Sequence, residues 1–315
     1  MPRVDAASLA AGLLLGVLAD ALAGDPRRAH PVAGFGRAAA ALERLAWRDS
    51  RTVGAGYVAA SLAAPVALAA AAQRATAARP LARTALVAVT TWAVVGGTSL
   101  GREARGVAGA LTAGDLGESR RRVPALCGRD PASLDHDGVV RAAVESVAEN
   151  TSDAAVAPLL WGAALGVPGL VGYRVVNTLD AMVGHRSARY ERFGWAAARL
   201  DDVANYLPAR LTAALACALA PVVGGDRRKA RDVLRRDGAR HPSPNAGRCE
   251  AAFAGALDRT LGGRNSYAGR VEDRPSLGTG GPPVVADVGR AVRLLRAVTV
   301  AATAICAALA IGLRR

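Results

Sequence analysis

The stretch Glu145-Ser-Val-Ala-Glu-Asn-Thr-Ser-Asp-Ala-Ala-Val-Ala-Pro-Leu-Leu-Trp161 joins an acidic segment to an apolar one. If its first half is helical, Glu145, Glu149 and Asp153 lie on one face of the helix. Like charges at this spacing repel each other, and no Lys or Arg is interleaved to relieve them. After Asp153 the chain turns apolar and stays so to about residue 173. This predicts a helix face that meets a cation or a polar substrate at the bilayer edge. A solvated face and pairing with arginines of another helix are the alternatives.

The composition indicates a membrane protein. The 315 residues are 51% hydrophobic, yet the formal net charge is +14. These two properties conflict in a soluble protein and agree in a membrane protein with cationic loops. Nucleic-acid binding is the usual alternative for so basic a chain. We exclude it because the arginines lie in loops between apolar runs, and because aromatic residues, at 4%, offer few stacking surfaces.

Six apolar segments have lengths near the ~20 residues that a helix needs to cross hydrocarbon. They predict an all-α fold, a polytopic integral membrane bundle with about five to six apolar segments and a single domain over residues 1–315. The segment 154–173 contains Pro158 and Gly166 among other helix breakers. A broken helix at membrane depth must line a cavity or pack on protein, so about five full crossings are expected. The segments are 8–23, 52–73, 84–100, 154–173, 207–223 and 294–313.

Long arginine-rich loops connect these segments and are expected to contain helices. By the positive-inside rule, the loops 24–51, 101–153 and 224–293 should face the cytoplasm. This predicts a multi-pass protein of the cell membrane (inner or plasma) with its main loops cytoplasmic. Ala21-Leu22-Ala23 resembles a signal-peptidase site, but Asp20 beside it favours a membrane helix that is retained.

Two polar motifs follow apolar segments on either side of the acidic face. In Gly24–Val32, Gly24 can end the first helix, and two prolines stiffen the turn that carries Asp25 and His30. A simple helix exit is the alternative. In 173–206, the spacing of Arg174, Asn177 and Asp180 projects polar groups from one helix face, and so does that of Arg199, Asp202 and Asn205. Arg186 offers a fork of donors for phosphate or carboxylate. Solvated ion pairs are the alternative here.

A third motif, His241–Glu250, precedes an Ala-rich helix that we expect to end near Gly262 and Gly263. Ser243 or Asn245 suits an N-cap, and a helix N-terminus attracts phosphate. A cap and turn without a ligand explain the motif equally well. Asn265-Ser-Tyr267 follows the helix.

Several common sites are missing from the sequence. No GxxxxGK[ST] motif is present, so an ATP-using enzyme here would not be of the P-loop type. No GxSxG elbow and no HExxH pair occur. The four cysteines are far apart without a CxxC pair, which indicates neither a zinc site nor a disulfide framework.

Taken together and in this order, the motifs resemble those of the CobD/CbiB family of cobalamin biosynthesis, the adenosylcobinamide-phosphate synthases. The resemblance runs from near the N-terminus to about residue 270. It departs from the family pattern at Arg248-Cys249, where the family usually has Trp-Pro, and at Asn150–Ala154, where NTVDG is common. The matching stretches are GDPRRAHPV, ESVAENTSDAAVAPLLW, YRVVNTLDAMVGHRSARYERFGWAAARLDD, HPSPNAGRCEAAFAGAL and NSYAG.

The resemblance implies an integral membrane ligase acting on a corrinoid. It implies ATP- and Mg²⁺-dependent joining of (R)-1-amino-2-propanol, or its O-phosphate, to a propionate carboxylate of adenosylcobyric acid, which gives adenosylcobinamide (phosphate). The expected route is an acyl phosphate that the amine attacks. The implied partners are these small molecules and membrane lipid. Association with other corrin-pathway enzymes is a further implication. A small transporter of a polar or anionic solute is the rival function.

On this resemblance we assign hypothetical roles to the polar residues. Mg²⁺, which prefers oxygen ligands, is assigned to three carboxylates, and the base for the ammonium nucleophile to one of three other groups. The remaining residues are candidates for substrate binding. The metal ligands are Glu145, Glu149 and Asp153; the candidate bases are Asp180, Asp202 and His241; the substrate-binding residues are Asp25, His30, Asn150, Arg174, Asn177, Arg186, Ser243, Asn245, Asn265 and Tyr267.

Overall fold

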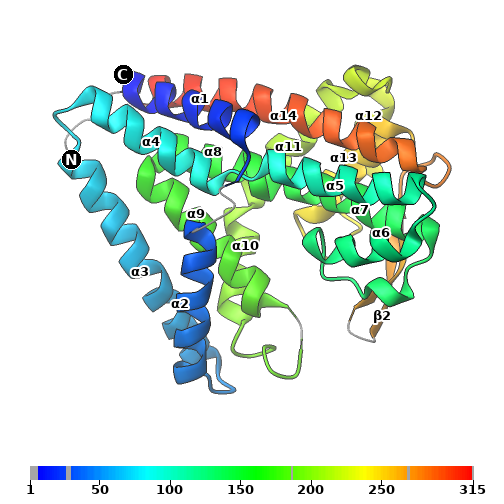
Figure 1. The fold of residues 1–315 in the computed structure, drawn as a ribbon, viewed down its shortest axis with the longest axis horizontal. Coiled ribbons are helices and arrows are strands. Elements are labelled where there is room, and N and C mark those ends of the chain that lie inside the picture. Colours follow the sequence, from blue (N-terminus) through cyan, green and yellow to red (C-terminus); the bar gives the residue numbers. More distant parts are fainter. Residues whose placement is uncertain (1–5, 26–29, 186, 268–269, 314–315) are drawn as a thin grey trace. The chain divides into compact units, whose positions relative to one another are not determined.

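The computed structural model describes residues 6–25, 30–185, 187–267 and 270–313, without the side chains of 264–272, and is predominantly helical (Figure 1). The chain divides into two compact units. Unit 1 comprises Met1–Gly96, Ala157–Asn205 and Thr303–Arg315; unit 2 comprises Gly97–Val156 and Tyr206–Ala302. The all-α membrane fold predicted from the sequence is confirmed in its class.

Unit 1 consists of helices in the part of the chain that the structure describes. α1 packs extensively on α4, and α9 packs on α3 and α8. The elements are α1 (Ala6–Ala23), α2 (Pro31–Ala46), α3 (Arg51–Ala75), α4 (Pro80–Val94), α8 (Ala157–Leu165), α9 (Val167–Leu179), the π-helix η4 (Asp180–Gly184), α10 (Trp195–Ala204) and the end of α14 (Val285–Gly312).

Unit 2 surrounds the buried helix α13 (Ala246–Leu257), which packs on α12, α11 and α7. A two-stranded antiparallel hairpin of β1 and β2 adds the only sheet among the described residues. The other elements are α5 (Gly97–Thr112), α6 (Leu116–Arg122), η1 (Val123–Ala125), η2 (Pro131–Ser133), α7 (His136–Thr151), the π-helix η3 (Ser152–Val156), α11 (Tyr206–Ala218), η5 (Ala220–Val223), α12 (Arg227–Asp237), β1 (Leu261–Tyr267), β2 (Arg270–Leu277) and most of α14.

Within the described residues, four helical stretches are long and apolar enough to cross a membrane: Ala6–Ala23, Arg51–Ala75, Pro80–Thr112 and Val285–Gly312. The predicted number of five to six apolar membrane segments is therefore higher than the four found. Segment 154–173 divides into α8 and α9 at Gly166, whose φ of +73° suits glycine. Segment 207–223 divides into α11 and the short η5, because Pro221 opens a 3-10 turn. None of the helices α8, α9, α11 and η5 reaches the length that a membrane crossing needs.

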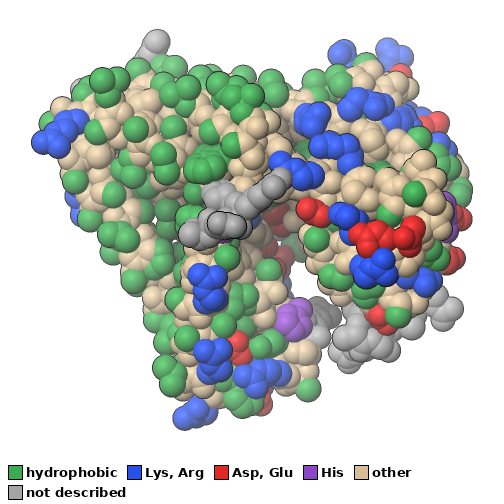
Figure 2. All heavy atoms as spheres, in the orientation of Figure 1, with side chains coloured by type: hydrophobic (Ala, Val, Ile, Leu, Met, Phe, Trp, Pro, Cys, Tyr) green, Lys and Arg blue, Asp and Glu red, His purple; other side chains and the backbone are tan. Residues whose placement is uncertain are grey.

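Exposed large apolar side chains are concentrated on the long apolar helices. Figure 2 shows hydrophobic side chains covering much of the surface over α1 and α3. A water-facing surface rarely carries so many, whereas a lipid-facing one needs them. On α1, α3, α4 and α14 they are Leu14, Leu15, Leu18, Leu22, Leu68, Leu81, Val89, Val300, Ile305, Leu309 and Ile311.

One local prediction for the first polar motif is confirmed, and the structure adds a cap that was not predicted. α1 ends at Ala23, and Gly24 follows it with φ +66° and a backbone N–H that donates to Asp20 O at 2.8 Å. His30 precedes α2, and its Nδ1 accepts a hydrogen bond from Val32 N at 3.2 Å. His30 thus serves as the N-cap of α2, a local structural role that was not predicted from the sequence.

The hairpin was not expected in an all-α chain. α13 ends at Leu257, five residues before Gly262, because Asp258 adopts the left-handed conformation with φ +57°. Gly262 and Gly263 then take φ values of +85° and +86°, and a register irregularity lies between Leu261 and Gly263. Glycines that suit such positive φ values favour a bulged strand over a longer helix.

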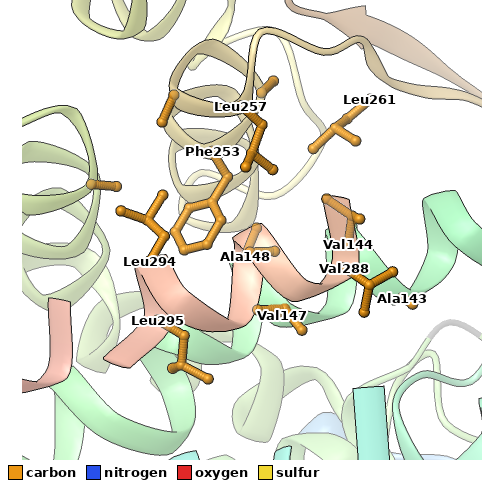
Figure 3. Close-up of a cluster of buried hydrophobic side chains, with 14 of the residues drawn as sticks. Ala143, Val144, Val147, Ala148, Phe253, Leu257, Leu261, Val288, Leu294 and Leu295 are labelled. Atoms are coloured by element: carbon orange, nitrogen blue, oxygen red, sulfur yellow. The ribbon is translucent and has the colours of Figure 1, made fainter. Parts of the chain in front are cut away.

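The core of unit 2 forms where α13 meets α7 and α14. Phe253 and Leu257 of α13, Val147 of α7 and Leu294 of α14 are fully or almost fully buried and lie together in Figure 3. Each such side chain stabilises the fold by about 1.5–3 kcal/mol on removal from water. Gly255 permits a close crossing with α12, since a Cβ there would lie 2.6 Å from Ala230 Cα. This packing fixes α7 and α13 against each other, and both carry site residues.

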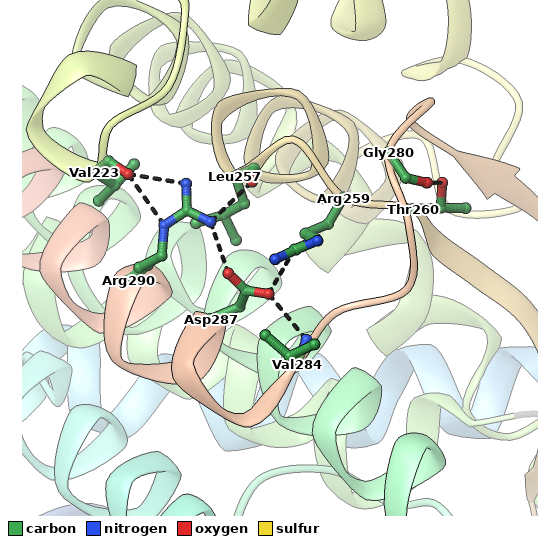
Figure 4. Close-up of polar contacts among 8 residues, drawn as sticks. All are labelled: Val223, Leu257, Arg259, Thr260, Gly280, Val284, Asp287 and Arg290. Atoms are coloured by element: carbon green, nitrogen blue, oxygen red, sulfur yellow. Dashed lines mark hydrogen bonds and ion pairs between the residues drawn. The ribbon is translucent and has the colours of Figure 1, made fainter.

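Asp287 fastens the start of α14 to the ends of its neighbours (Figure 4). Its Oδ2 accepts from Val284 N at 2.9 Å and from Arg259 Nε at 2.6 Å, and its Oδ1 accepts from Arg290 Nη1 at 2.7 Å. Arg290 also donates to Val223 O, at 2.9 Å, so its guanidinium serves a carbonyl that would otherwise end a helical turn without a partner.

We expect Asp287→Ala to destabilise unit 2 by about 2–3 kcal/mol, since the buried carboxylate holds charged donors. A lowered thermal unfolding temperature of the detergent-solubilised protein is the measurement. Asp226→Ala, which removes an exposed cap of α12, is the matched control, with an expected loss of about 1 kcal/mol. Equal losses in the two variants would contradict a special role for Asp287.

A second buried carboxylate predicts acid sensitivity. Asp237 accepts from Arg236, from Arg240 Nη1 at 3.3 Å and from Gly278 N at 2.9 Å, and these contacts lower its pKa from 3.8 to about 2, with the Arg236 hydrogen bond the largest cause. A lowered folded-state pKa stabilises the protein above the ordinary pKa, and this stabilisation is lost as the pH falls.

We therefore expect about 1–2 kcal/mol of stability to disappear between about pH 4 and pH 2, after allowing for the solvent around the arginines. Asp237→Asn should flatten this part of a plot of unfolding free energy against pH while lowering stability at pH 7. An unchanged slope in the variant would show that Asp237 does not titrate in this range.

Candidate functional site: a buried acidic cluster with two arginines

The acidic face predicted from the sequence lies on α7 in unit 2. Asp135 caps this helix, since its carboxylate accepts from Gly138 N at 2.8 Å. Glu145 and Glu149 lie one turn apart on it, as predicted. Asp153 falls in the following π-helix η3, where the wider turn changes the rotation per residue. The three carboxylates therefore do not continue one regular α-helical row.

Glu145 is 2% exposed and has partners at both carboxylate oxygens. Oε2 accepts from Arg129 Nη2, and Oε1 accepts from the backbone N–H of Gly262 at 2.6 Å. Arginine pairing, one of the alternatives raised for this face, thus holds for Glu145. The carboxylate joins α7 both to the loop that carries Arg129 and to β1.

Arg129 reaches Glu145 because the preceding turn is fastened to α7. Ser146 Oγ donates to Leu126 O at 2.6 Å, and Val123 of η1 is buried in the core of unit 2. Arg129 itself is 5% exposed. A buried arginine is tolerated where a carboxylate neutralises it, as Glu145 does here.

Glu149 and Glu250 add two further carboxyl groups to the cluster. Burial is the largest cause that raises the pKa of Glu149, with a further increase from Glu145; the charges of Arg274 and Arg129 oppose it. Glu250, on α13, is 1% exposed, and burial followed by the charges of Glu145 and Glu149 raises its pKa well above the usual value. Shifts of this kind are typical of functional sites, although structural networks also produce them.

His241 faces Glu250 from the loop before α13. Its Nε2 lies 4.0 Å from Glu250 Oε1, and its Nδ1 accepts from Ser243 N at 3.0 Å. Burial, and then the positive charges of Arg274 and Arg129, lower the pKa of His241 to about 4. The imidazole is therefore neutral at physiological pH.

Asn245 occupies the N-cap position of α13, and Ser243, two residues earlier, supplies the side-chain oxygen that caps the helix; both were predicted candidates. Ser243 Oγ accepts from Ala246 N at 3.1 Å, while Asn245 makes no capping bond with its side chain. Asn245 Oδ1 instead accepts from Arg210 Nη1 at 3.4 Å, and the Arg210 guanidinium lies over the ring of Tyr206. The polar side chains at this terminus are therefore used locally in the structure.

Asn150 is also engaged near its own turn: its Nδ2 donates to Ser146 O at 3.0 Å. Among the residues that the structure describes, no group of three or more His, Cys, Asp or Glu side chains is placed to hold a metal ion. The Mg²⁺ site of Glu145, Glu149 and Asp153 thus gains no support from the geometry and stays a prediction.

Unit 1 contains a separate polar row built by α9 and α10. Tyr173 OH donates to Asn205 Oδ1 at 2.9 Å, and Asn205 Nδ2 donates to Asp201 Oδ2 at 3.0 Å. Arg174 Nη1 donates to Asn177 Oδ1 at 3.2 Å, and Asn177 Nδ2 reaches Asp201 Oδ1 at 3.5 Å. The row joins both predicted polar faces of residues 173–206 through Asp201, which sequence reasoning had not singled out.

Other predicted residues of unit 1 lie around this row or apart from it. Asp180 begins η4, where a Cβ on Gly184 would lie 1.9 Å from its Oδ1, so a larger residue there would displace the Asp180 carboxylate. Asp202 forms a 3.6 Å ion pair with Arg199, the solvated pairing considered above, and burial raises its pKa while Arg199 lowers it. Asp25 follows Gly24 after α1.

Three predicted residues cannot be placed as side chains. Arg186 lies outside the described residues. Asn265 and Tyr267 lie on β1, but their side chains lie outside the described part of the chain. Their assignment to the site stays a prediction.

Sequence reasoning missed three members of the unit 2 cluster: Arg129, Glu250 and Arg274. Glu250 had a usable signal, because it is the only acidic residue in the apolar helix α13. Arg129 and Arg274 had none, since a loop arginine and a strand arginine stand out neither by period nor by motif in a chain with 40 Lys and Arg residues.

Comparison with known proteins identifies a family. The family model described as "CobD/Cbib protein" matches residues 13–295, which include every residue predicted for the site. The cobalamin biosynthesis protein CobD of Mycobacterium tuberculosis (strain ATCC 25618 / H37Rv) is 55% identical over 307 residues, covering 97% of each chain. Namesakes from Chromobacterium violaceum and Geobacter metallireducens are 45% identical over 293 and 43% over 290 residues, each covering 90% of this chain and 91% of the relative. No solved structure gives a significant match.

Proposed function

This chain belongs to the CobD/CbiB family and has a role in cobalamin biosynthesis, and on this premise we propose that it is an amide-forming ligase. It would join (R)-1-amino-2-propanol, or its O-phosphate, to a propionate carboxylate of adenosylcobyric acid with ATP, giving adenosylcobinamide (phosphate). The observation that carries the proposal is the cluster of unit 2, in which the buried Arg129, Glu145, Glu250 and neutral His241 lie with the partly exposed Glu149 and Arg274.

Amide formation from a carboxylate needs both signs of charge at one place. The carboxylate must be activated, for which an acyl phosphate is the economical route, and the amine arrives as an ammonium ion. Arg129 and Arg274 supply positive charge for phosphate oxygens. Burial raises the pKa values of Glu149 and Glu250, and the approaching ammonium group favours their ionised form, so that they pair with it. Burial strengthens each of these interactions relative to water.

In this proposal Mg²⁺ is bound to the phosphates of ATP. Mg²⁺ keeps several waters and commonly binds substrate phosphates with one or two carboxylates. The described residues do not form a resident metal site, and Glu145 already binds Arg129 and Gly262. We therefore derive no step from a protein-bound metal ion, and MgATP is treated as a substrate.

The decisive assay uses purified protein in detergent with adenosylcobyric acid, the aminopropanol or its phosphate, ATP and Mg²⁺. We expect an amide product that depends on ATP and on the amine. Parallel runs with free and phosphorylated aminopropanol identify the preferred nucleophile. Absence of any ATP-dependent amide, together with solute uptake into proteoliposomes, would favour the transporter.

We also propose a multi-pass location in the cell membrane with the main loops in the cytoplasm. Four apolar helical stretches and a charge of +14 support this proposal. Reporter fusions within 113–135, 185–194 and 238–245 should all report the cytoplasmic side. A fusion in any of these loops that reports the opposite side would contradict the proposed topology.

A further inference from the structure

His241 and Glu250 form a buried pair that lacks hydrogen-bond partners where it should have them. Their exposed fractions are 9% and 1%, and Nε2 to Oε1 is 4.0 Å, too long for a hydrogen bond. Neither Nε2 of His241 nor Oε2 of Glu250 has a hydrogen-bond partner among the described residues. Native proteins seldom leave buried polar atoms unpaired, so the pair points to a ligand that completes it.

The backbone fixes which nitrogen of His241 carries the proton. A peptide N–H can only donate, and that of Ser243 donates to Nδ1 at 3.0 Å. The neutral imidazole must therefore have its hydrogen on Nε2. The low pKa of this ring, about 4, agrees with a neutral state. In this arrangement Nε2 is a donor and has no lone pair for a proton, so His241 does not fit the role of base.

Glu250 has the opposite character. Its carboxyl group faces Glu145 and Glu149 from α7, Arg274 from β2, Arg129 from the loop before α7, and His241. Burial and the two carboxylates raise its pKa, and a carboxylate with a raised pKa accepts a proton more readily than one on the surface.

We propose that His241 and Glu250 form the acyl-transfer subsite: His241 Nε2–H donates to the oxygen of the reacting carboxyl group, and Glu250 accepts the proton of the attacking amine. The inference rests on the proposed ligase function. The centre formed when an amine attacks an acyl phosphate carries an oxyanion and an N–H on the same carbon. A donor and an acceptor side by side complement these two groups.

The step balances without a further reactant. The amine nitrogen forms a bond to the acyl carbon, and the bond from that carbon to the phosphate oxygen breaks with its electron pair on the phosphate. An ammonium nitrogen loses two protons on the way to an amide. Glu250 accepts the first before the attack and passes it to solvent, and accepts the second as the bond to the phosphate oxygen breaks and passes it to the departing phosphate or to solvent. His241 keeps its proton throughout and is a hydrogen-bond donor to the developing oxyanion.

Two amines of different charge distinguish the loss of a base at Glu250 from a general loss of activity. Aminopropanol is an ammonium ion at pH 7 and must lose a proton before it attacks. Hydroxylamine is neutral at pH 7 and can attack without losing a proton first. We expect Glu250→Gln to lower kcat for aminopropanol phosphate at least about 100-fold and kcat for hydroxamate formation less than about 10-fold. Equal losses with both amines would overturn the base role.

Two substitutions at His241 separate a donor from a base. Gln keeps a side-chain N–H, so we expect His241→Gln to stay within about 10-fold of wild-type kcat with an unchanged pH profile. His241→Ala should lose at least about 100-fold. If Gln and Ala fail equally, or if His241→Gln removes the acid limb of the pH profile, the donor role is wrong.

Controls keep these outcomes distinct. His136→Gln, at an exposed position at the start of α7, should leave kcat unchanged. Unfolding temperatures of every variant show whether a loss comes from misfolding. A variant that fails to fold is replaced by Glu250→Asp in the two-amine comparison, or by His241→Asn in the comparison with His241→Ala. If wild-type protein forms neither amide nor hydroxamate, the proposed ligase function fails; if it forms both and the variants show no such pattern, only the subsite fails.

Discussion

Glu149→Gln is expected to lower kcat/KM for the amine at least about 100-fold while the protein stays folded and inserted in the membrane. Glu149 is partly exposed, lies one turn from Glu145 on α7, and contributes negative charge to the cluster that is proposed to draw in the ammonium group. Gln has nearly the same shape and removes only the charge. The measurement is the rate of ATP-dependent amide formation as a function of amine concentration.

Stability gives this prediction a second, independent readout. Burial and Glu145 raise the pKa of Glu149, so its ionised form is disfavoured in the folded protein relative to the unfolded chain. A raised carboxyl pKa means that stability falls as the pH rises through it, and the neutral Gln avoids this loss. Glu149→Gln should therefore unfold at the same or a higher temperature than the wild type, the pattern of a residue kept for function at some cost in stability.

The matched control is Glu118→Gln on α6. Glu118 is a partly exposed partner of Arg121 and Arg122, and surface ion pairs contribute little, so neither activity nor unfolding temperature should change. Near-normal activity of Glu149→Gln would remove the acidic face of α7 from the mechanism. A large loss of stability in that variant would instead mark Glu149 as structural.

The sequence was sufficient for features that depend on local order. Gly24 ends α1, Gly166 breaks the segment 154–173, and Glu145 and Glu149 share a helix, all as predicted. Each of these depends on residues within one or two turns, where propensity and capping dominate. The all-α class follows from the same local signals together with the long apolar runs.

The number of membrane-spanning helices and the hairpin were less predictable. Hydropathy alone could not show that 207–223 divides at Pro221, because the apolar run continues through the break. The hairpin depends on Gly262 and Gly263 in positive-φ conformations. The sequence gives little signal for the pairing of β1 with β2, because apolar and polar residues hardly alternate along these strands. In both cases the backbone conformation at a few residues determines the secondary structure, and composition alone does not predict it.

The candidate site was predictable only in part, because half of it is made by distant partners. Glu145 looked like one of three equivalent carboxylates, yet its contacts come from Arg129 and from Gly262, 117 residues further along the chain. No periodicity links such positions. Glu250 could have been found as a lone charge in the apolar helix α13, since a buried charge needs a reason.

These contacts predict that Glu145, unlike Glu149, is needed for the fold of unit 2. We expect Glu145→Ala to destabilise the protein by about 3–5 kcal/mol, because it leaves the Arg129 charge buried without its partner. The same change removes the acceptor of Gly262 N and so loosens β1 from α7. The measurement is the unfolding free energy in denaturant of protein in detergent, with amide protection of Gly262 by hydrogen exchange.

A double-mutant cycle separates the two losses. In Arg129→Met with Glu145→Leu, no charge is left unpaired, so most of the penalty should be regained, and the coupling between the positions should be about 2–3 kcal/mol. Gly262 N still lacks its acceptor in the double variant, so its exchange protection should stay low even as global stability returns. Recovery of both would show that β1 is held by other contacts. Additive losses would show that the Arg129–Glu145 pair contributes little to the stability of unit 2.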